Sequence, residues 1–110
     1  MKKNEIWLAD LDPQRGKEQS GARPVVVISG NAMNDHFDLV IICPLSSRVK
    51  NFVGGVLLNP SKSNGLQVES EVLTFHVRSI SKNRLIKKLG SVSTFEMESI
   101  VTNLNNVLKY

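Results

Sequence analysis

The fold of this 110-residue chain is constrained most by a series of short segments rich in β-branched and other apolar residues. Each segment is bounded by turn-forming residues. Such segments are typical of β-strands in a small sheet. The predicted strands cover residues 5–11, 23–29, 39–43, 53–58 and 72–80, and a basic strand runs from Lys87 beyond Gly90. Pro44 is expected to end the third strand, since proline cannot donate to a sheet. Residues 31–35 are expected to form turns, and residues 81–85 a single helical turn.

Residues 72–80 show the clearest alternation of apolar and polar side chains. Successive side chains of a strand point to opposite faces, so this pattern predicts a half-buried strand. The expected core face carries Leu73, Phe75 and Val77, and the expected outer face carries Thr74, His76 and Arg78.

The C-terminal segment predicts one amphipathic helix. Ser93 and Glu96 have the spacing of a capping box, which marks a helix start. Apolar residues then recur at helical intervals, at Met97, Ile100, Val101, Leu104, Val107 and Leu108. We therefore expect a mostly β protein: one domain over residues 1–110, built from a small, strongly bent antiparallel sheet or open barrel with a C-terminal helix.

The composition is that of a soluble globular protein, with 41% hydrophobic and 22% charged residues. The longest apolar run, residues 39–43, is far below the roughly 20 residues that a membrane helix needs. Asn4 and Glu5 stand where a signal peptide would place its apolar stretch. The single cysteine, Cys43, lies in an apolar run and is expected to be buried. These features predict a cytoplasmic protein without a membrane segment.

Positive charge is concentrated in the middle of the chain. Residues 39–95 contain eight basic residues and two acidic ones, a net charge of +6, although the whole chain carries only +4. One positive surface would suit a polyanion such as nucleic acid. A lysine-rich edge that only increases solubility is the alternative.

Neither metal nor cofactor chemistry is indicated by the sequence. His36 and His76 are 40 positions apart, and neither has cysteine or carboxylate residues at metal-ligand spacing nearby. Phosphate-binding loops and dinucleotide fingerprints are also missing from the sequence. We therefore expect no metal site and no cofactor.

Arg23 is the first candidate for chemistry. It follows a polar loop bracketed by Gly16 and Gly21, and it begins a predicted strand. Strands that are neighbours in sequence usually pair, so Arg23 and Ser46 are expected to share one rim of the sheet. An arginine and a hydroxyl can together stabilise a phosphodiester, and RNA supplies its own 2′-hydroxyl nucleophile. A surface loop with a solvated arginine is the alternative reading of the same residues.

Three separated motifs resemble the MazF/PemK (Kid-like) toxin family of bacterial toxin–antitoxin systems. The first is EIWLADLDP at residues 5–13, followed by Gly16, Glu18-Gln19, Gly21 and RPVVV at residues 23–27. The second is PLSSR at residues 44–48. The third is EVL at residues 71–73, with VRSI at residues 77–80 and Arg84-Leu85.

This resemblance implies a compact, twisted antiparallel sheet of the SH3-like barrel type. It also implies a homodimeric, metal-independent and ribosome-independent endoribonuclease that cuts single-stranded mRNA at specific sequences. The expected products carry a 2′,3′-cyclic phosphate and a 5′-hydroxyl, and a cognate antitoxin is the expected inhibitor. Arg23 matches the family's catalytic arginine, and Ser46 stands where many members have an essential threonine.

The remaining candidate site residues are expected to bind RNA: Glu18, Gln19, Ser47, Arg48, His76 and Arg78. A role in acid–base catalysis or simple exposure stays open for His76, and a structural role in the loop stays open for Glu18 and Gln19. Leu73 and Phe75 occupy positions where Kid-like members have an arginine and an aspartate, so the chain follows the MazF branch. Two other functions stay open: a toxin like CcdB that binds a topoisomerase subunit without hydrolysis, and a catalytically weak relative that only binds RNA.

Overall fold

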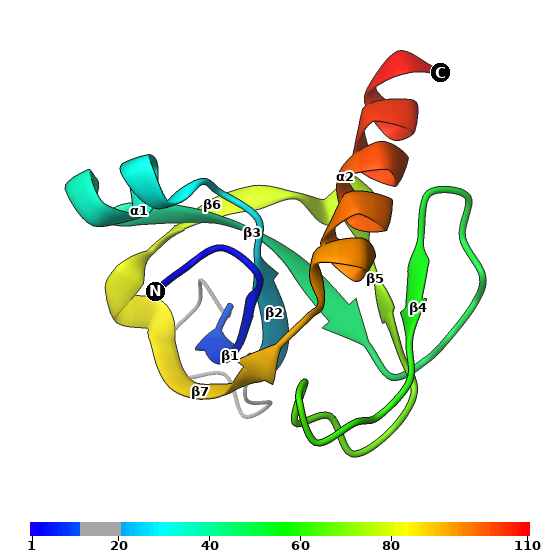
Figure 1. The fold of residues 1–110 in the computed structure, drawn as a ribbon, viewed down its shortest axis with the longest axis horizontal. Helices are drawn as coiled ribbons and strands as arrows, with labels where there is room; N and C mark the ends of the chain where they lie inside the picture. The colour runs from blue at the N-terminus through cyan, green and yellow to red at the C-terminus, as the bar shows by residue number, and fades with distance from the viewer. Residues whose placement is uncertain (12–20) are drawn as a thin grey trace.

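The computed structural model describes residues 1–11 and 21–110, and these residues form one curled antiparallel sheet with a C-terminal helix (Figure 1). Neighbouring strands follow the order β4-β5-β3-β2-β1-β7, and β6 pairs with β3. The strands are β1 Glu5–Asp10, β2 Ala22–Val27, β3 Leu39–Ser46, β4 Val56–Leu58, β5 Ser70–Val72, β6 Arg78–Ser81 and β7 Leu85–Ser91. The mostly β fold predicted from the sequence is confirmed.

The long helix α2, Thr94–Lys109, begins at the predicted capping box. The Glu96 backbone N–H donates to Ser93 Oγ at 3.0 Å, and the Ser93 backbone N–H donates to a Glu96 carboxylate oxygen at 2.8 Å. The helix buries Met97 and Ile100, whereas Leu108, predicted on the same apolar stripe, is exposed. Figure 1 shows α2 following β7 and standing beside the β4–β5 edge of the sheet.

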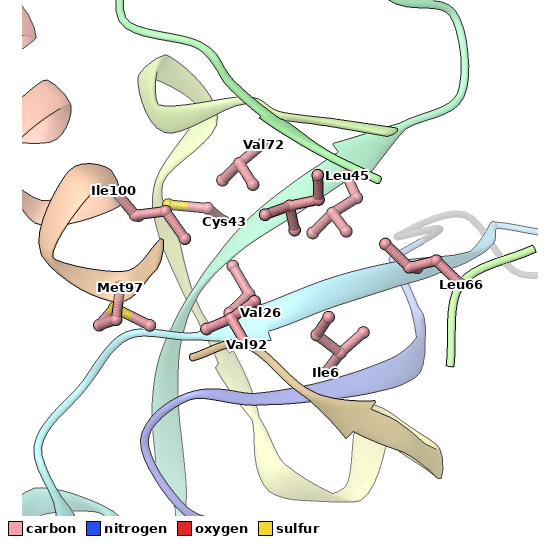
Figure 2. Close-up of a cluster of buried hydrophobic side chains, with 10 residues drawn as sticks. Ile6, Val26, Cys43, Leu45, Leu66, Val72, Val92, Met97 and Ile100 are labelled. Atoms are coloured by element: carbon pink, nitrogen blue, oxygen red, sulfur yellow. The ribbon is translucent and has the colours of Figure 1, made fainter. Parts of the chain in front are cut away.

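Alternate side chains of the central strands enter two separate apolar clusters, as the two-residue period of a strand requires. Val26 of β2 and Cys43 of β3 join the cluster that Met97 and Ile100 of α2 also enter (Figure 2). Val25 and Val27 of β2, with Val40 and Ile42 of β3, join the other cluster. Both clusters therefore hold β2 and β3 rigidly between them.

The strand β3 continues through Pro44 to Ser46, so the prediction that Pro44 ends it was wrong. The first half of β3 pairs with β6, and its last two residues pair with β5. Pro44 lies between these two pairings, where a missing N–H costs the least. Its carbonyl still accepts the Leu73 N–H at 2.9 Å.

The continuous strand predicted over residues 72–80 was also wrong. The chain forms β5, then the single 3₁₀ turn η1, Thr74–His76, and then β6. This turn exchanges the expected burial of two residues: Thr74 is fully buried and Phe75 is exposed. His76 and Arg78 are exposed, as predicted. Burial of Thr74 is possible because its hydroxyl donates to the Gly54 carbonyl at 2.6 Å.

Two smaller predictions need correction, and one holds. Residues 31–36 form the short helix α1, Asn31–His36, rather than turns, because the buried Asn34 amide hydrogen-bonds back to Ser29. The strand predicted over residues 53–58 shortens to β4, since residues 53 and 54 form a turn. The helical turn predicted near residue 83 is confirmed as η2, Lys82–Arg84.

Candidate active site

A pocket of about 710 Å³ opens where β2 begins and β3 ends. The antiparallel ladder between these strands pairs Val25 with Pro44. The same register, continued two residues further, brings Arg23 opposite Ser46, and both residues line the pocket. The structure thus places the two predicted catalytic residues at one rim, as the order of the strands indicates; their catalytic roles stay predictions.

The two rim residues differ in their surroundings. Arg23 is exposed, and no carboxylate of the described residues forms an ion pair with it. Ser46 is half-buried, and its Oγ accepts the Arg48 backbone N–H at 3.1 Å and lies 3.4 Å from the Arg48 carbonyl oxygen. The rim therefore offers a guanidinium that no described carboxylate pairs with, beside a hydroxyl that a local turn already orients.

The next two predicted residues, Ser47 and Arg48, also line this pocket. Both are exposed at the turn that follows β3. A second cation and a second hydroxyl thus lie on the same side of the pocket as Ser46. Guanidinium groups suit phosphate because their fork of donors matches two oxygens at once.

A second wall of the pocket was not predicted from the sequence. It consists of Gly65, Leu66, Gln67, Val68 and Ser70. The buried Asn64 side chain shapes this wall, because its Oδ1 accepts the Ser61 N–H at 3.0 Å and the Leu66 N–H at 2.9 Å. An Asn-Gly pair following a serine was the available signal for such a turn.

Gly65 lets this wall approach β7 closely. Its φ of 69° lies in the left-handed region, and a Cβ there would overlap the Leu89 carbonyl. The adjacent Ser63 carbonyl accepts the Ser91 N–H at 2.8 Å. This wall of the pocket is thus fixed against a strand more than twenty residues later in the sequence.

The structure does not bring two of the predicted RNA-binding residues, His76 and Arg78, to this pocket. His76 and Arg78 are exposed but are not among the residues that line it. Arg78 pairs with Ile42, four residues before Ser46, which corresponds to roughly 13 Å along a strand. Glu18 and Gln19 lie outside the described residues. The pocket lining therefore includes the Ser46 segment and not His76 or Arg78.

Several basic side chains expected to form a positive surface contact the protein itself. The Lys82 ammonium donates to the Asn34 carbonyl, and the Arg84 guanidinium donates to the Asp10 carbonyl at 3.1 Å. Lys88 pairs with Glu5 at 3.2 Å. These three cations are consequently less available to a polyanion than Arg23 or Arg48.

The titratable groups give no nucleophile in the described part of the site. Cys43 is buried, as predicted, and burial raises the pKa of its thiol to about 12, so it stays protonated. Among residues 1–11 and 21–110, no group of three His, Cys, Asp or Glu side chains is arranged to hold a metal ion. None of the described helices is both long and apolar enough to cross a membrane.

The curled sheet and the arginine–serine rim define a small β protein with an open site suited to a phosphate group. A model of the family described as "PemK-like, MazF-like toxin of type II toxin-antitoxin system" matches residues 2–108, and the chain belongs to this family. The chain is 31% identical to endoribonuclease MazF9 of Mycobacterium tuberculosis, over 91% of this chain and 89% of the relative. It is 33% identical to endoribonuclease MazF of Staphylococcus saprophyticus, over 91% and 84%.

Solved structures of the same family share the fold. MazF of Deinococcus radiodurans (Form-I) superposes with a TM-score of 0.81 at 29% identity, covering 100% of this chain and 97% of that one. A MazE–MazF structure from the same organism (Form-II) gives a TM-score of 0.84 at 27% identity, covering 99% and 96%. An endoribonuclease solved with its cognate antitoxin, from a mycobacterial species, has a TM-score of 0.81 at 24% identity, covering 99% and 95%, which shows the fold alone.

Proposed function

We propose that the chain is a single toxin domain, residues 1–110, that cleaves single-stranded mRNA at specific sequences without metal and without the ribosome. The observation that carries this proposal is the meeting of Arg23 and Ser46 at one pocket. Its relatives in Mycobacterium tuberculosis and Staphylococcus saprophyticus bear the name endoribonuclease, which supports the same reaction.

The proposed reaction uses a nucleophile that belongs to the substrate. The 2′-oxygen of one ribose attacks the adjacent phosphorus, and the bond from phosphorus to the 5′-oxygen breaks. The 2′-hydroxyl loses its proton and the departing 5′-oxygen gains one, so the products carry a 2′,3′-cyclic phosphate and a 5′-hydroxyl. Negative charge increases on the non-bridging oxygens as phosphorus becomes five-coordinate, and fixed donors at that position lower the barrier.

Arg23 and Ser46 supply these donors in the proposed mechanism. The Arg23 guanidinium binds two phosphate oxygens through its fork of N–H groups. A serine hydroxyl has one donor and two acceptor positions. The Ser46 Oγ can therefore keep the N–H bond from Arg48 and turn its own hydrogen from the Arg48 carbonyl to the phosphate.

The proton acceptor for the 2′-hydroxyl is not assigned to any described residue. No carboxylate and no imidazole is among the described residues that line the pocket. Arg23 is a poor base because its guanidinium stays protonated. In the proposed mechanism Arg23 and Ser46 stabilise the charge on the phosphate and do not act as the general base.

The remaining predicted contacts extend from the pocket. Ser47 and Arg48 lie at its mouth and are proposed to bind the RNA backbone. His76 and Arg78 are proposed to contact RNA outside it, where an exposed ring and guanidinium can stack on unpaired bases. Glu18 and Gln19, outside the described residues, are proposed to contact RNA from the segment before Arg23.

We further propose two protein partners. Structures of related MazF toxins include complexes with the antitoxin MazE, so a cognate antitoxin is the proposed inhibitor of this chain. The second partner is another copy of the chain in a homodimer. A cytoplasmic location stays a prediction from the sequence.

The test is incubation of the purified protein with a long single-stranded RNA in EDTA, followed by mapping of the new 5′ ends. The proposal expects cuts at one short sequence, and new 5′ ends that accept a radiolabel from polynucleotide kinase without phosphatase treatment. Lys109→Ala, which removes an exposed cation at the end of α2, is the matched control and should cut like the wild type. Intact RNA under these conditions, or 5′-phosphate ends, would overturn the proposed reaction.

A further inference from the structure

We propose that Glu71 is a positioning residue that fixes residues 47–53, the segment carrying Ser47 and Arg48 at the mouth of the pocket. The expected effect of Glu71 on RNA binding rests on the proposed function, whereas its effect on the order of the segment does not. Glu71 is the middle residue of β5 and the Cα partner of Ser46 in the ladder between β3 and β5.

Two hydrogen bonds tie this segment to the Glu71 side chain. The Lys50 backbone N–H donates to Oε1 at 3.0 Å, and the Phe52 backbone N–H donates to Oε2 at 2.7 Å. Glu71 is only 1% exposed, and no ion pair joins it to another described residue. A buried carboxylate is costly unless it is hydrogen-bonded, so these two N–H groups are its principal compensation.

We call the Glu71 carboxylate and the two N–H groups of Lys50 and Phe52 that it binds the clamp. The backbone at Asn51 is bent in the way that this clamp requires. Asn51 has a φ of 54°, in the left-handed region that asparagine tolerates better than most residues. A left-handed residue between two others turns their N–H groups toward one point, which creates an anion-binding concavity. Here the anion is the protein's own Glu71 carboxylate.

The chain leaves room for this carboxylate at Gly55. A Cβ built at Gly55 would overlap the Glu71 carboxylate, and its nearest neighbours are all Glu71 side-chain atoms. The turn that includes Gly55 is itself closed by a hydrogen bond from its N–H to the Phe52 carbonyl at 2.9 Å. Glycine at this position thus preserves the clamp.

The clamp lies between the pocket and the ring cluster formed by Phe52, Phe75 and His76. At one end of the segment, the Ser46 hydroxyl orients Arg48. At the other end, the Phe52 ring packs edge-on against Phe75 with centroids 5.0 Å apart, and Phe75 lies against His76 at 4.6 Å. Loss of the clamp should therefore loosen both groups together while leaving Arg23, on β2, in place.

The first test compares Glu71→Gln with Val72→Ala, which removes apolar contacts from the same strand without touching the clamp. Glutamine keeps the shape of Glu71 but turns a donor toward one of the two N–H groups. Hydrogen exchange at the Lys50 and Phe52 amides should accelerate on the order of tenfold in Glu71→Gln beyond any change at the core amide of Val26. Val72→Ala should accelerate all these amides together.

RNA cleavage gives the second measurement. Because the segment binds RNA and Arg23 is unaffected, Glu71→Gln should raise KM on the order of tenfold and change kcat by no more than about twofold. Val72→Ala, assayed well below its melting temperature, should leave KM unchanged. A merely structural Glu71 would give both variants the same KM.

Gly55→Ala tests the clamp without altering Glu71 and covers the case in which Glu71→Gln does not fold. Its methyl group should displace the carboxylate and reproduce the faster exchange and higher KM. Gly30→Ala is the matched control, since a Cβ there meets no atom within 4 Å. Unchanged exchange at Lys50 and Phe52 in the folded variants would overturn the clamp. A wild type that cuts no RNA would overturn the proposed function alone, and the exchange data would still decide the clamp.

Discussion

Arg23 of β2 and Ser46 of β3 line one pocket because the ladder between these strands pairs Val25 with Pro44. Val25 is fully buried and Pro44 is buried beside it, so the pairing is held by the core rather than by the loops. Groups that act together on a charged transition state benefit from such fixed placement, since no energy is then spent on reorganising them. The contribution of each group can be measured separately.

Ser46→Ala should lower kcat/KM for RNA cleavage by about 10²-fold, the typical effect of removing one donor from such a site. Ser46→Thr should keep the activity or raise it, because threonine retains the hydroxyl and its methyl group restricts the rotamer. Steady-state kinetics on one RNA that contains a single cleavage site would measure both. Equal activity of Ser46→Ala and wild type would remove Ser46 from the mechanism.

Gln67→Ala should change which sequences are cut more than how fast they are cut. Gln67 is exposed on the second wall of the pocket, and an amide can donate to and accept from the edge of an unpaired base. Mapping cleavage sites over a long RNA for both proteins would reveal the change in preference. An identical set of sites would contradict a role for this wall in recognition.

Glu5 should make stability depend on acid pH. Burial raises the pKa of Glu5, but hydrogen bonds from the Trp7 indole, the Lys2 backbone N–H and Lys88 outweigh it and leave the pKa lowered. A lowered folded-state pKa adds stability above the unfolded value, roughly 4.3, and that stability is lost as pH falls through the folded value.

Glu5→Gln should therefore be less stable than wild type by about 1 kcal/mol at pH 7, with a difference that shrinks as pH falls from about 5 toward 3. Urea denaturation at several pH values would measure this, with the exposed Glu98→Gln as control. A difference that stays constant over this pH range would show that the Glu5 carboxylate does not carry the effect.

Thr74→Val should destabilise the fold by about 1–3 kcal/mol, because it removes the fully buried hydroxyl that donates to the Gly54 carbonyl. Thr74→Ser keeps the donor and should lose less. Urea denaturation of the three proteins would rank them. A Val variant as stable as wild type would show that this hydrogen bond contributes nothing net.

Local sequence signals predicted the helices and strands that are determined by residues close to them in the sequence. The Ser93–Glu96 capping box marks the start of α2, and the apolar run after Arg23 marks β2. The break at η1 has no such local cause. It follows from the change of partner along β3 at Pro44, which a two-residue alternation cannot reveal.

The candidate site also has one part that could be predicted from the sequence and one part that depends on long-range contacts. Arg23 and Ser46 could be placed together because strands adjacent in sequence usually pair, and β2 pairs with β3. The wall formed by Gly65 to Ser70 could not be placed, because its position depends on contacts between the Asn64 turn and β7. His76 and Arg78 were correctly expected to be exposed, but the break between β5 and β6 was not predicted from the sequence.

The most direct test of the proposed site is the single-turnover cleavage rate of Arg23→Ala and Arg23→Lys on a single-site RNA in EDTA, beside the wild type. The arginine–serine rim predicts a rate reduced by about 10²-fold or more in Arg23→Ala. Arg23→Lys should recover only part of it, because an ammonium lacks the fork that binds two oxygens. Wild-type rates in both variants, with the same 5′ ends, would contradict the central claim.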